Sequence, residues 1–378
     1  SSDLDTKFEL DDQFTFELLD VFGAGQPTFS KNVSVVTIVN DDTPPVVTVN
    51  SALVVSTPEG NGPTMNQLVF TAVLSNATYQ TLVVPFDTSD GTATLADLDY
   101  QQVVDGAITF AENALTQTFA VDVVGDNKYE LDETVNVTLD ALGTGTAGTY
   151  TVGAPATHFG TITNDDAAPT VTLADLTGTE GTPMLITATL SNPSYETITV
   201  TLNTVSGGAN PATAGADYTE AVGVTLTFPA SVGITNNLVS SAHDAAPVAD
   251  GLYELPENFL GTITAGAGTV SSVQATNATF TIISNDPIPT LEINNVSDLE
   301  GDTGTTPFVF TVTQSAVSGE TTTFQVFTAD GTAKATAADY AAIVGTTYTI
   351  PEGSLTVTSR SMSTAMSRLR KTRPSSST

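Results

Sequence analysis

The 378-residue sequence contains no cysteine and no tryptophan, and it has only nine basic residues against 42 acidic ones. Without cysteine, neither disulfide bonds nor thiol chemistry can contribute to this protein. The formal net charge of −33 argues against binding to nucleic acid or anionic membrane surfaces and favours cations as partners. No run of about 18 apolar residues is present, so we expect no insertion into a membrane.

The residues that are abundant favour β-structure. Hydrophobic residues make up 40% of the chain, which is enough for packed cores. Many of them alternate with polar residues, as they do in half-buried strands. Examples are LVFTAVL (68–74), QTLVVPF (80–86) and QTFAVDVV (117–124). The sequence therefore predicts an all-β protein.

Four motifs recur along the chain, with corresponding positions 116 to 124 residues apart. One copy of each is STPEGNG (56–62), DGTATLADLDY (90–100), KYELDETVNVTL (128–139) and GTITNDD (160–166). This spacing is too long for a solenoid repeat and matches the length of an independent β-sandwich. We predict tandem immunoglobulin-like β-sandwiches of about seven antiparallel strands each, arranged as beads on a string.

The repeats divide the chain into five segments. Complete domains occupy 44–166 and 167–286, and partial domains occupy 1–43 and 287–358. The last segment, 359–378, is a basic tail. A partial sandwich exposes unpaired strands, so we expect the intact protein to extend upstream. Short proline-bearing linkers, which restrict bending between domains, lie at Pro44–Pro45, Pro169, Pro287 and Pro289.

Acidic residues gather where predicted strands begin and end. In one turn Asp126, Glu130, Asp132 and Glu133 fall within eight positions, with a single lysine among them. Because the connections of an antiparallel sandwich meet at its two ends, the acids of several turns are expected to converge. Carboxylates at that density repel one another or take up protons. A calcium ion, which accepts about six to eight oxygen ligands from flexible loops, removes this repulsion.

The motifs DGTATLADLDY, YELDETVNVTL and GTITNDD, in this order and spacing, resemble the Calx-β family. That family is named for the regulatory calcium-binding domains of sodium/calcium exchangers, and it occurs as tandem repeats in large bacterial surface proteins. The resemblance covers nearly the whole chain. It implies an immunoglobulin-like sandwich that binds calcium at the end nearest the next domain.

Carried over position by position, the resemblance implies three sets of calcium ligands. In 44–166 they are Glu59, Asp99, Asp126, Glu130, Glu133, Asp165 and Asp166, with the backbone carbonyl of Lys128 as a further candidate. In 167–286 they are Glu180, Asp217, Asp250, Glu254, Glu257 and Asp286. The partial domain 1–43 retains Asp5, Glu9, Asp12, Asp41 and Asp42.

The second complete domain departs from the pattern at two places. Pro256 stands where the first domain has Asp132, which is itself not expected to be a direct ligand. The exit of its last strand carries one carboxylate, Asp286, where the first domain has two. Fewer charged ligands predict weaker calcium binding in 167–286.

Enzyme activity is not expected. Paired carboxylates also serve glycoside hydrolysis, but that chemistry needs aromatic residues to stack on sugars, and aromatics are only 7% of the chain. A His243–Asp244 pair lies in a polar stretch without a G-x-S-x-G motif, and we interpret His243 as a loop histidine.

The function that these features predict is a calcium-binding structural and adhesion region of a large extracellular or cell-surface protein. Calcium would rigidify its domains and junctions, and the expected partners are calcium, neighbouring domains and cell-surface or matrix ligands. The first alternative is a cadherin-like adhesion repeat, and the second is a non-catalytic accessory region of a secreted carbohydrate-active enzyme. We expect secretion from a bacterium, although the first residues contain no signal peptide.

The tail 359–378 holds five of the nine basic residues and no acid. The alternatives are a disordered basic arm and an anion-binding patch, but we interpret the tail as a shifted reading frame. Codons permitted for it, read one nucleotide earlier, can spell VEVNVNGDVEAEEDEAFVVD. That reading places G-D-x-x-x-E-x-D-E in register with Gly125–Glu133, 240 positions earlier.

Resequencing the source DNA tests this interpretation of the tail. We expect a one-nucleotide difference near the codon for residue 359, after which the chain continues with an acidic turn and an alternating strand. An unchanged reading frame would show that the basic tail is genuine.

Overall fold

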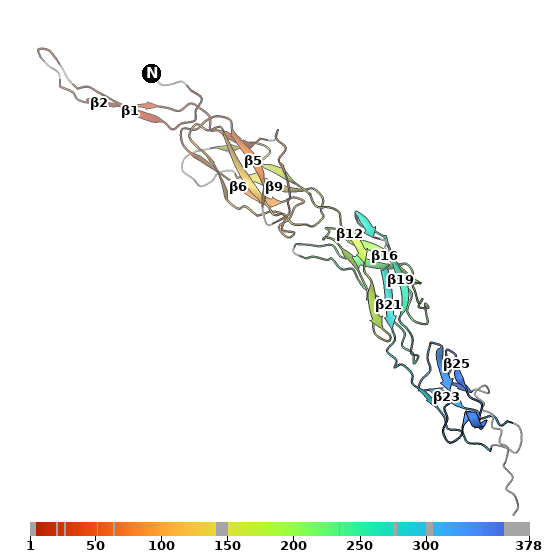
Figure 1. Cartoon of the computed structure of the whole chain (residues 1–378). Helices are drawn as coiled ribbons and strands as arrows, with labels where there is room; N and C mark the ends of the chain where they lie inside the picture. The colour runs from red at the N-terminus through yellow and green to blue at the C-terminus, as the bar shows by residue number, and fades with distance from the viewer. Residues whose placement is uncertain are drawn as a thin grey trace, which may run out of the picture.

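The computed structural model describes residues 5–19, 22–25, 28–50, 52–62, 65–140, 150–233, 235–274, 278–299 and 305–358. It is an elongated string of β-sandwich units, with the two partial domains at opposite ends of the string (Figure 1). These ranges contain strands and a single 3-10 helix, Ala335–Ala337, which confirms the all-β prediction. No helix in them has the length and apolar character needed to cross a membrane. The basic tail lies outside the described residues.

The domain 44–166 is a sandwich of two sheets. Its strands are β3 (Val46–Val49), β4 (Ser56–Pro58), β5 (Asn66–Leu74), β6 (Leu82–Asp90), β7 (Gly106–Phe110), β8 (Thr116–Val123), β9 (Glu133–Leu139), β10 (Thr151–Val152) and β11 (Thr157–Thr163). One sheet has the order β10-β3-β5-β8 and the other β4-β11-β9-β6-β7. The first and last strands each pass from one sheet to the other. They pair in parallel with each other in both sheets, β3 with β10 and β4 with β11. When each is counted as one interrupted strand, the sandwich has the expected strand number.

Alternating side chains build the core between these sheets. Along β5, Leu68, Phe70 and Ala72 are buried while the residues between them face outward or lie at intermediate depth. The rings of Phe70 and Phe86 both pack on Phe119, with centroids 5.4 and 4.7 Å away. The strand predicted from the acidic repeat is β9, whose apolar positions are fully buried. The hydrophobic periodicity therefore positions the loops at both ends of the sandwich.

The domain 167–286 repeats this arrangement of two sheets. They are β12 (Thr170–Leu173), β13 (Leu176–Thr179), β14 (Leu185–Ile186), β15 (Ala188–Leu190), β16 (Ile198–Ser206), β17 (Val224–Phe228), β18 (His243–Asp244), β19 (Glu257–Ala265), β20 (Ser272–Gln274) and β21 (Ala278–Ile283). The sheets have the orders β15-β12-β20 and β13-β21-β19-β16-β17, with β14 and β18 forming a separate pair. The rings of Tyr218 and Phe259 stack with their centroids 3.9 Å apart, in a hydrophobic core formed by this domain.

His243 lies in strand β18 and not in a loop, so that prediction was wrong. It pairs with Ile186 of β14. The carboxylate of Asp244 accepts hydrogen bonds from the backbone N–H groups of Met184 and Ala246, at 2.9 and 2.8 Å. A two-residue strand gives no alternation to recognise, because backbone pairing alone defines it. The Asp244 carboxylate thus has a structural role.

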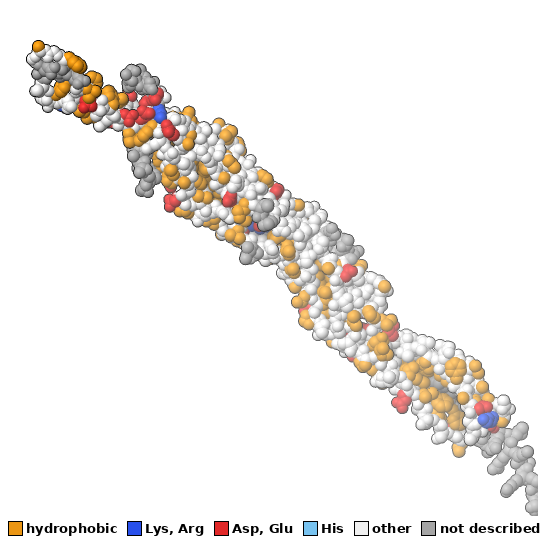
Figure 2. Space-filling model, turned by 60° about the vertical axis from the view of Figure 1, so that its left-hand side comes forward, with side chains coloured by type: hydrophobic (Ala, Val, Ile, Leu, Met, Phe, Trp, Pro, Cys, Tyr) orange, Lys and Arg blue, Asp and Glu red, His pale blue; other side chains and the backbone are white. Residues whose placement is uncertain are grey.

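The two partial domains are less completely packed. Residues 1–43 contain an exposed antiparallel hairpin of β1 (Asp12–Glu17) and β2 (Val33–Ile38), on which apolar side chains face solvent (Figure 2). Residues 287–358 contain β22 (Leu291–Ile293), β23 (Thr311–Gln314), β24 (Thr322–Phe327), β25 (Val344–Ile350) and β26 (Thr356–Thr358). The only fully buried apolar residues in the described part of 287–358 are Val312 and Ile350.

One aromatic residue of each acidic turn reaches the next domain, where its backbone pairs with the backbone of that domain. The three bridges join Phe8 to Thr78, Tyr129 to Ser194 and Tyr253 to Ser318. At the central junction Tyr129 N donates to Pro193 O, and Tyr195 N donates to Tyr129 O, both at 3.0 Å. Each acidic turn is therefore attached directly to the following domain.

The packing of the 44–166 core gives a stability prediction. Phe70→Ala should lower the free energy of unfolding of this domain by about 3–5 kcal/mol, because Phe70 is fully buried and its loss leaves a cavity. The neighbouring Val69 is 52% exposed, so Val69→Ala is the matched control, with a loss below about 1 kcal/mol. Guanidinium denaturation of the full chain measures both, and equal losses would contradict the packing described.

Candidate metal centre

The acidic turns share one hydrogen bond between a carboxylate and the backbone. The first acid of each turn accepts a hydrogen bond from the backbone N–H two residues later, which fixes the turn. The three bonds are Lys7 N to Asp5 Oδ1 at 2.9 Å, Lys128 N to Asp126 Oδ1 at 2.6 Å and Leu252 N to Asp250 Oδ1 at 2.7 Å. The same turn is therefore built in three successive domains.

Glycine lets the acidic turn approach the first strand. Gly60 follows Glu59 and has φ +82°, a conformation that residues with a side chain rarely adopt. A Cβ atom on Gly125 would overlap the carbonyl oxygen of Gly60. Because Gly125 lacks a side chain, the two backbones can come into contact there, which brings Glu59 next to Asp126. In 167–286 Gly181, with φ +68°, follows Glu180 in the same way.

The first cluster consists of three carboxylates that come from strand ends far apart in the sequence. In 44–166 it is formed by Glu59, Asp126 and Asp166, whose nearest oxygens lie within 4.8 Å of one another. In 167–286 the equivalent residues, Glu180, Asp250 and Asp286, meet within the same distance.

Several oxygens of the first clusters are buried without a partner. Glu59 and Glu180 are each only 4% exposed. Among the described residues, Asp166 Oδ2, Glu180 Oε2 and Asp286 Oδ2 have no hydrogen-bond partner. A buried carboxylate oxygen without a hydrogen-bond donor is unfavourable. A cation bound beside it would supply the positive charge that the missing donor does not.

The second cluster lies beside the first and combines acids of the motif that ends in Asp-Tyr with acids of the acidic turn. In 44–166 it is formed by Asp97, Asp99 and Glu130, and Glu133 shares a hydrogen bond with Asp99. In 167–286 it is formed by Asp217, Glu254 and Glu257. The turns match, because Asp99 accepts from Thr94 N and Asp217 from Thr213 N, both at 2.6 Å.

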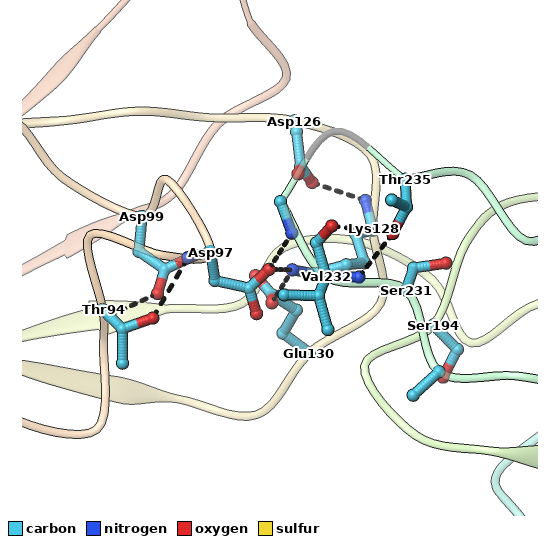
Figure 3. A network of polar contacts seen from close by, with 12 residues as sticks. Thr94, Asp97, Asp99, Asp126, Lys128, Glu130, Ser194, Ser231, Val232 and Thr235 are labelled. Carbon is cyan, nitrogen blue, oxygen red and sulfur yellow. Dashed lines mark hydrogen bonds and ion pairs between the residues drawn. The ribbon is translucent and has the colours of Figure 1, made fainter.

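A lysine side chain enters the second cluster of 44–166. Lys128 Nζ lies 2.7 Å from Asp97 Oδ1 and 2.6 Å from Glu130 Oε1 (Figure 3). The sequence had indicated only its backbone carbonyl. Residues 231–233 of the next domain lie close by, and Gly233 N donates to Asp97 Oδ1. The second cluster is thus formed at the junction between two domains.

Burial and mutual repulsion raise the pKa values of carboxyls in both kinds of cluster. Burial, followed by repulsion from Glu130 and Asp126, raises the pKa of Glu59 to about 8. Burial and the neighbouring Asp99 raise the pKa of Glu133 to about 8. In the next domain burial first, and then nearby acids, raise the pKa values of Glu254 and Glu257 to about 7.

The structure brings most of the predicted ligands of the complete domains together. Twelve of them lie in or directly beside the two kinds of cluster: Glu59, Asp99, Asp126, Glu130, Glu133, Asp166, Glu180, Asp217, Asp250, Glu254, Glu257 and Asp286. Asp165 is adjacent, but its Oδ1 accepts a hydrogen bond from Gly60 N at 3.0 Å. Whether each residue binds metal stays a prediction.

The predicted ligands of 1–43 form no such group. Among the described residues, Asp5, Glu9, Asp12, Asp41 and Asp42 do not occur in any set of three acids with oxygens within 4.8 Å. Lys7 instead pairs with Glu9 and with Glu112 of the next domain, each at 3.5 Å.

Two contributors to the site were not identified from the sequence. Asp97 has no acidic counterpart in the other domains, where Gly215 and Ala337 occupy its position, so repetition could not reveal it. Tyr129 does recur, as Phe8 and Tyr253, and this conserved place in the repeat was an available signal for the junction.

A further acidic group in 44–166 has a different explanation. Asp87, Asp105 and Asp140 meet within 4.8 Å, and Asp105 N donates to Asp87 Oδ1 at 2.7 Å. In the next domain the uncharged Asn203 makes the equivalent bond with Gly223 N. The contact caps a turn in both domains.

The raised pKa values give a prediction for the metal-free protein. Carboxyls that titrate near 7 to 8 when folded, against 4.5 when unfolded, bind more protons in the folded state. Stability in EDTA should therefore be highest near about pH 5 and fall as the pH rises to about 8. Thermal melting across this range measures the effect. A melting temperature that rises with pH throughout would contradict it.

Comparison with known proteins agrees with these features. The family model for the Calx-beta domain matches residues 40–166, 179–286 and 289–349. Among solved structures, CBD12 from CALX1.2 is 18% identical, covering 63% of this chain and 99% of that chain with a TM-score of 0.28. The apo-form Calx CBD1 domain is 21% identical, covering 32% of this chain and 99% of that chain with a TM-score of 0.26.

No curated protein matches the chain. The assignment follows from the family model, which matches more than half of the residues in three successive segments. The expected resemblance is confirmed: this chain belongs to the Calx-beta domain family, as a tandem array.

Proposed function

We propose that this chain is a non-catalytic calcium-binding region of a large extracellular or cell-surface protein, with complete domains at 44–166 and 167–286. Calcium bound at the ends of the domains stabilises them and stiffens their junctions. Adhesion to cell-surface or matrix ligands is the role that such a string would serve.

The observation that carries this proposal is the buried carboxylate of Glu180 and its surroundings. Its Oε2 has no hydrogen-bond partner within the described ranges and faces Asp250 and Asp286. No ion pair reaches these three acids from the described basic residues. An ion that supplied positive charge there would satisfy all three at once.

The donors suit calcium better than other metals. Every side-chain donor in the clusters is a carboxylate oxygen, which hard cations prefer, and the chain has no cysteine for softer metals. The acids come from several turns of different elements, a flexible arrangement that accommodates the larger coordination number of calcium. Magnesium demands a tighter octahedral geometry.

The same turns carry the acids and the interdomain contacts. Tyr129 lies between Lys128 and Glu130, and Tyr253 directly precedes Glu254. Ordering either turn with a bound ion therefore also orders the tyrosine that pairs with the next domain. This supports a role for calcium in stiffening the string.

An extracellular location is consistent with sites of this kind. Loop-borne calcium sites of extracellular modules bind with dissociation constants of about 10⁻⁴ to 10⁻³ M, which the calcium outside cells can fill.

Calcium should raise the melting temperature of the full chain relative to EDTA. Binding to the folded state alone adds about 4 kcal/mol when free calcium is about a thousand times the dissociation constant. Small-angle scattering should show a larger maximum dimension in calcium, because stiffer junctions extend the string. Magnesium at equal concentration is the control and should act more weakly. Identical melting curves in calcium and EDTA would refute the proposal.

A further inference from the structure

Lys128 is an unusual residue for the position that it occupies. Its side chain is 2% exposed, although charged residues are rarely buried so completely without a partner. Its ammonium lies within 2.7 Å of both Asp97 and Glu130, and Asp99 and Glu133 complete the same cluster. The domain thus places a fixed positive charge among four carboxylates.

The next domain has three of these four acids and lacks this charge. Leu252 stands where Lys128 does, and Gly215 stands where Asp97 does. Asp217, Glu254 and Glu257 still meet within 4.8 Å, and no described basic residue pairs with them. The two domains therefore differ in whether the second cluster contains a positive charge of its own.

The two ion pairs with Asp97 and Glu130 hold the ammonium inside the cluster. A calcium ion entering the same cluster would meet this like charge at close range or would have to expel a side chain that is packed in the interior. Either event opposes binding.

The same charge also contributes to the junction. Asp97 Oδ1 forms an ion pair with Lys128 Nζ and accepts a hydrogen bond from the backbone N–H of Gly233 in the next domain. Figure 3 shows the side chain of Lys128 directed towards Asp97 and Glu130, beside the segment of the next domain that carries Val232. The lysine thus fixes an acid that the following domain contacts.

We propose that the Lys128 ammonium takes the place of a calcium ion in the second cluster of 44–166, so that this domain binds calcium only at its first cluster. Resting on the proposed function, this inference leaves 167–286 with both clusters open to calcium. It reverses the ranking that the count of acidic ligands predicts. It also makes the junction between these two domains less dependent on calcium than the junction that follows.

Calcium titration calorimetry on the full chain tests this inference. Lys128→Leu introduces the residue that the next domain has, and it should raise the stoichiometry by one calcium per chain. Leu252→Lys places an ammonium in the second cluster of 167–286 and should lower it by one. Lys334→Leu removes the same charge at an exposed position and should change nothing.

The outcomes separate this inference from the proposed function. A wild-type chain that binds no calcium would refute the proposed function itself. A wild-type chain that binds calcium, with a folded Lys128→Leu variant of unchanged stoichiometry, would overturn only the inference about the lysine. If Lys128→Leu fails to fold in calcium, Leu252→Lys decides, and an unchanged stoichiometry in that variant overturns the inference.

Discussion

Repulsion among carboxylates at the ends of the sandwiches is the constraint on which the rest of the structure depends. Two sheets packed through Phe70, Phe119 and their neighbours hold the strand ends at fixed positions, and the acids cannot move apart without loss of that packing. Glu59 and Glu180 are held deepest, and burial keeps them from water that would screen their charge. Protons, an internal ammonium and metal ions are three means of relieving the same repulsion.

Much of the fold could be predicted from the sequence because its longest strands alternate clearly. Strands such as β5 and β9 bury every second residue, and the acidic motifs mark where they begin. Shorter strands could not be recognised this way. Strand β18 contains two residues defined only by pairing with β14, and the parallel contact of β4 with β11 joins segments 105 residues apart. Such pairings depend on tertiary packing, which no local pattern records.

In the site, residues that recur in each domain could be predicted, and residues that occur only once could not. Acids such as Glu130 and Glu254 occupy equivalent positions, so their convergence followed from repetition. The direction of the Lys128 side chain could not be predicted, because a lysine in the turn before a strand ordinarily keeps its charged end in solvent. Asp97 occurs once, and only its contacts with Lys128 and Gly233 show that it belongs to the cluster.

The parallel pairing of the first and last strands determines how the string carries mechanical load. Tension enters a domain through its first strand and leaves through its last, so it pulls β4 and β11 in opposite directions along their common axis. Their hydrogen bonds are then loaded together in shear and not opened one after another. The parallel pair β13 and β21 places 167–286 under the same geometry. Each complete domain is therefore arranged to resist extension where the chain enters and leaves it.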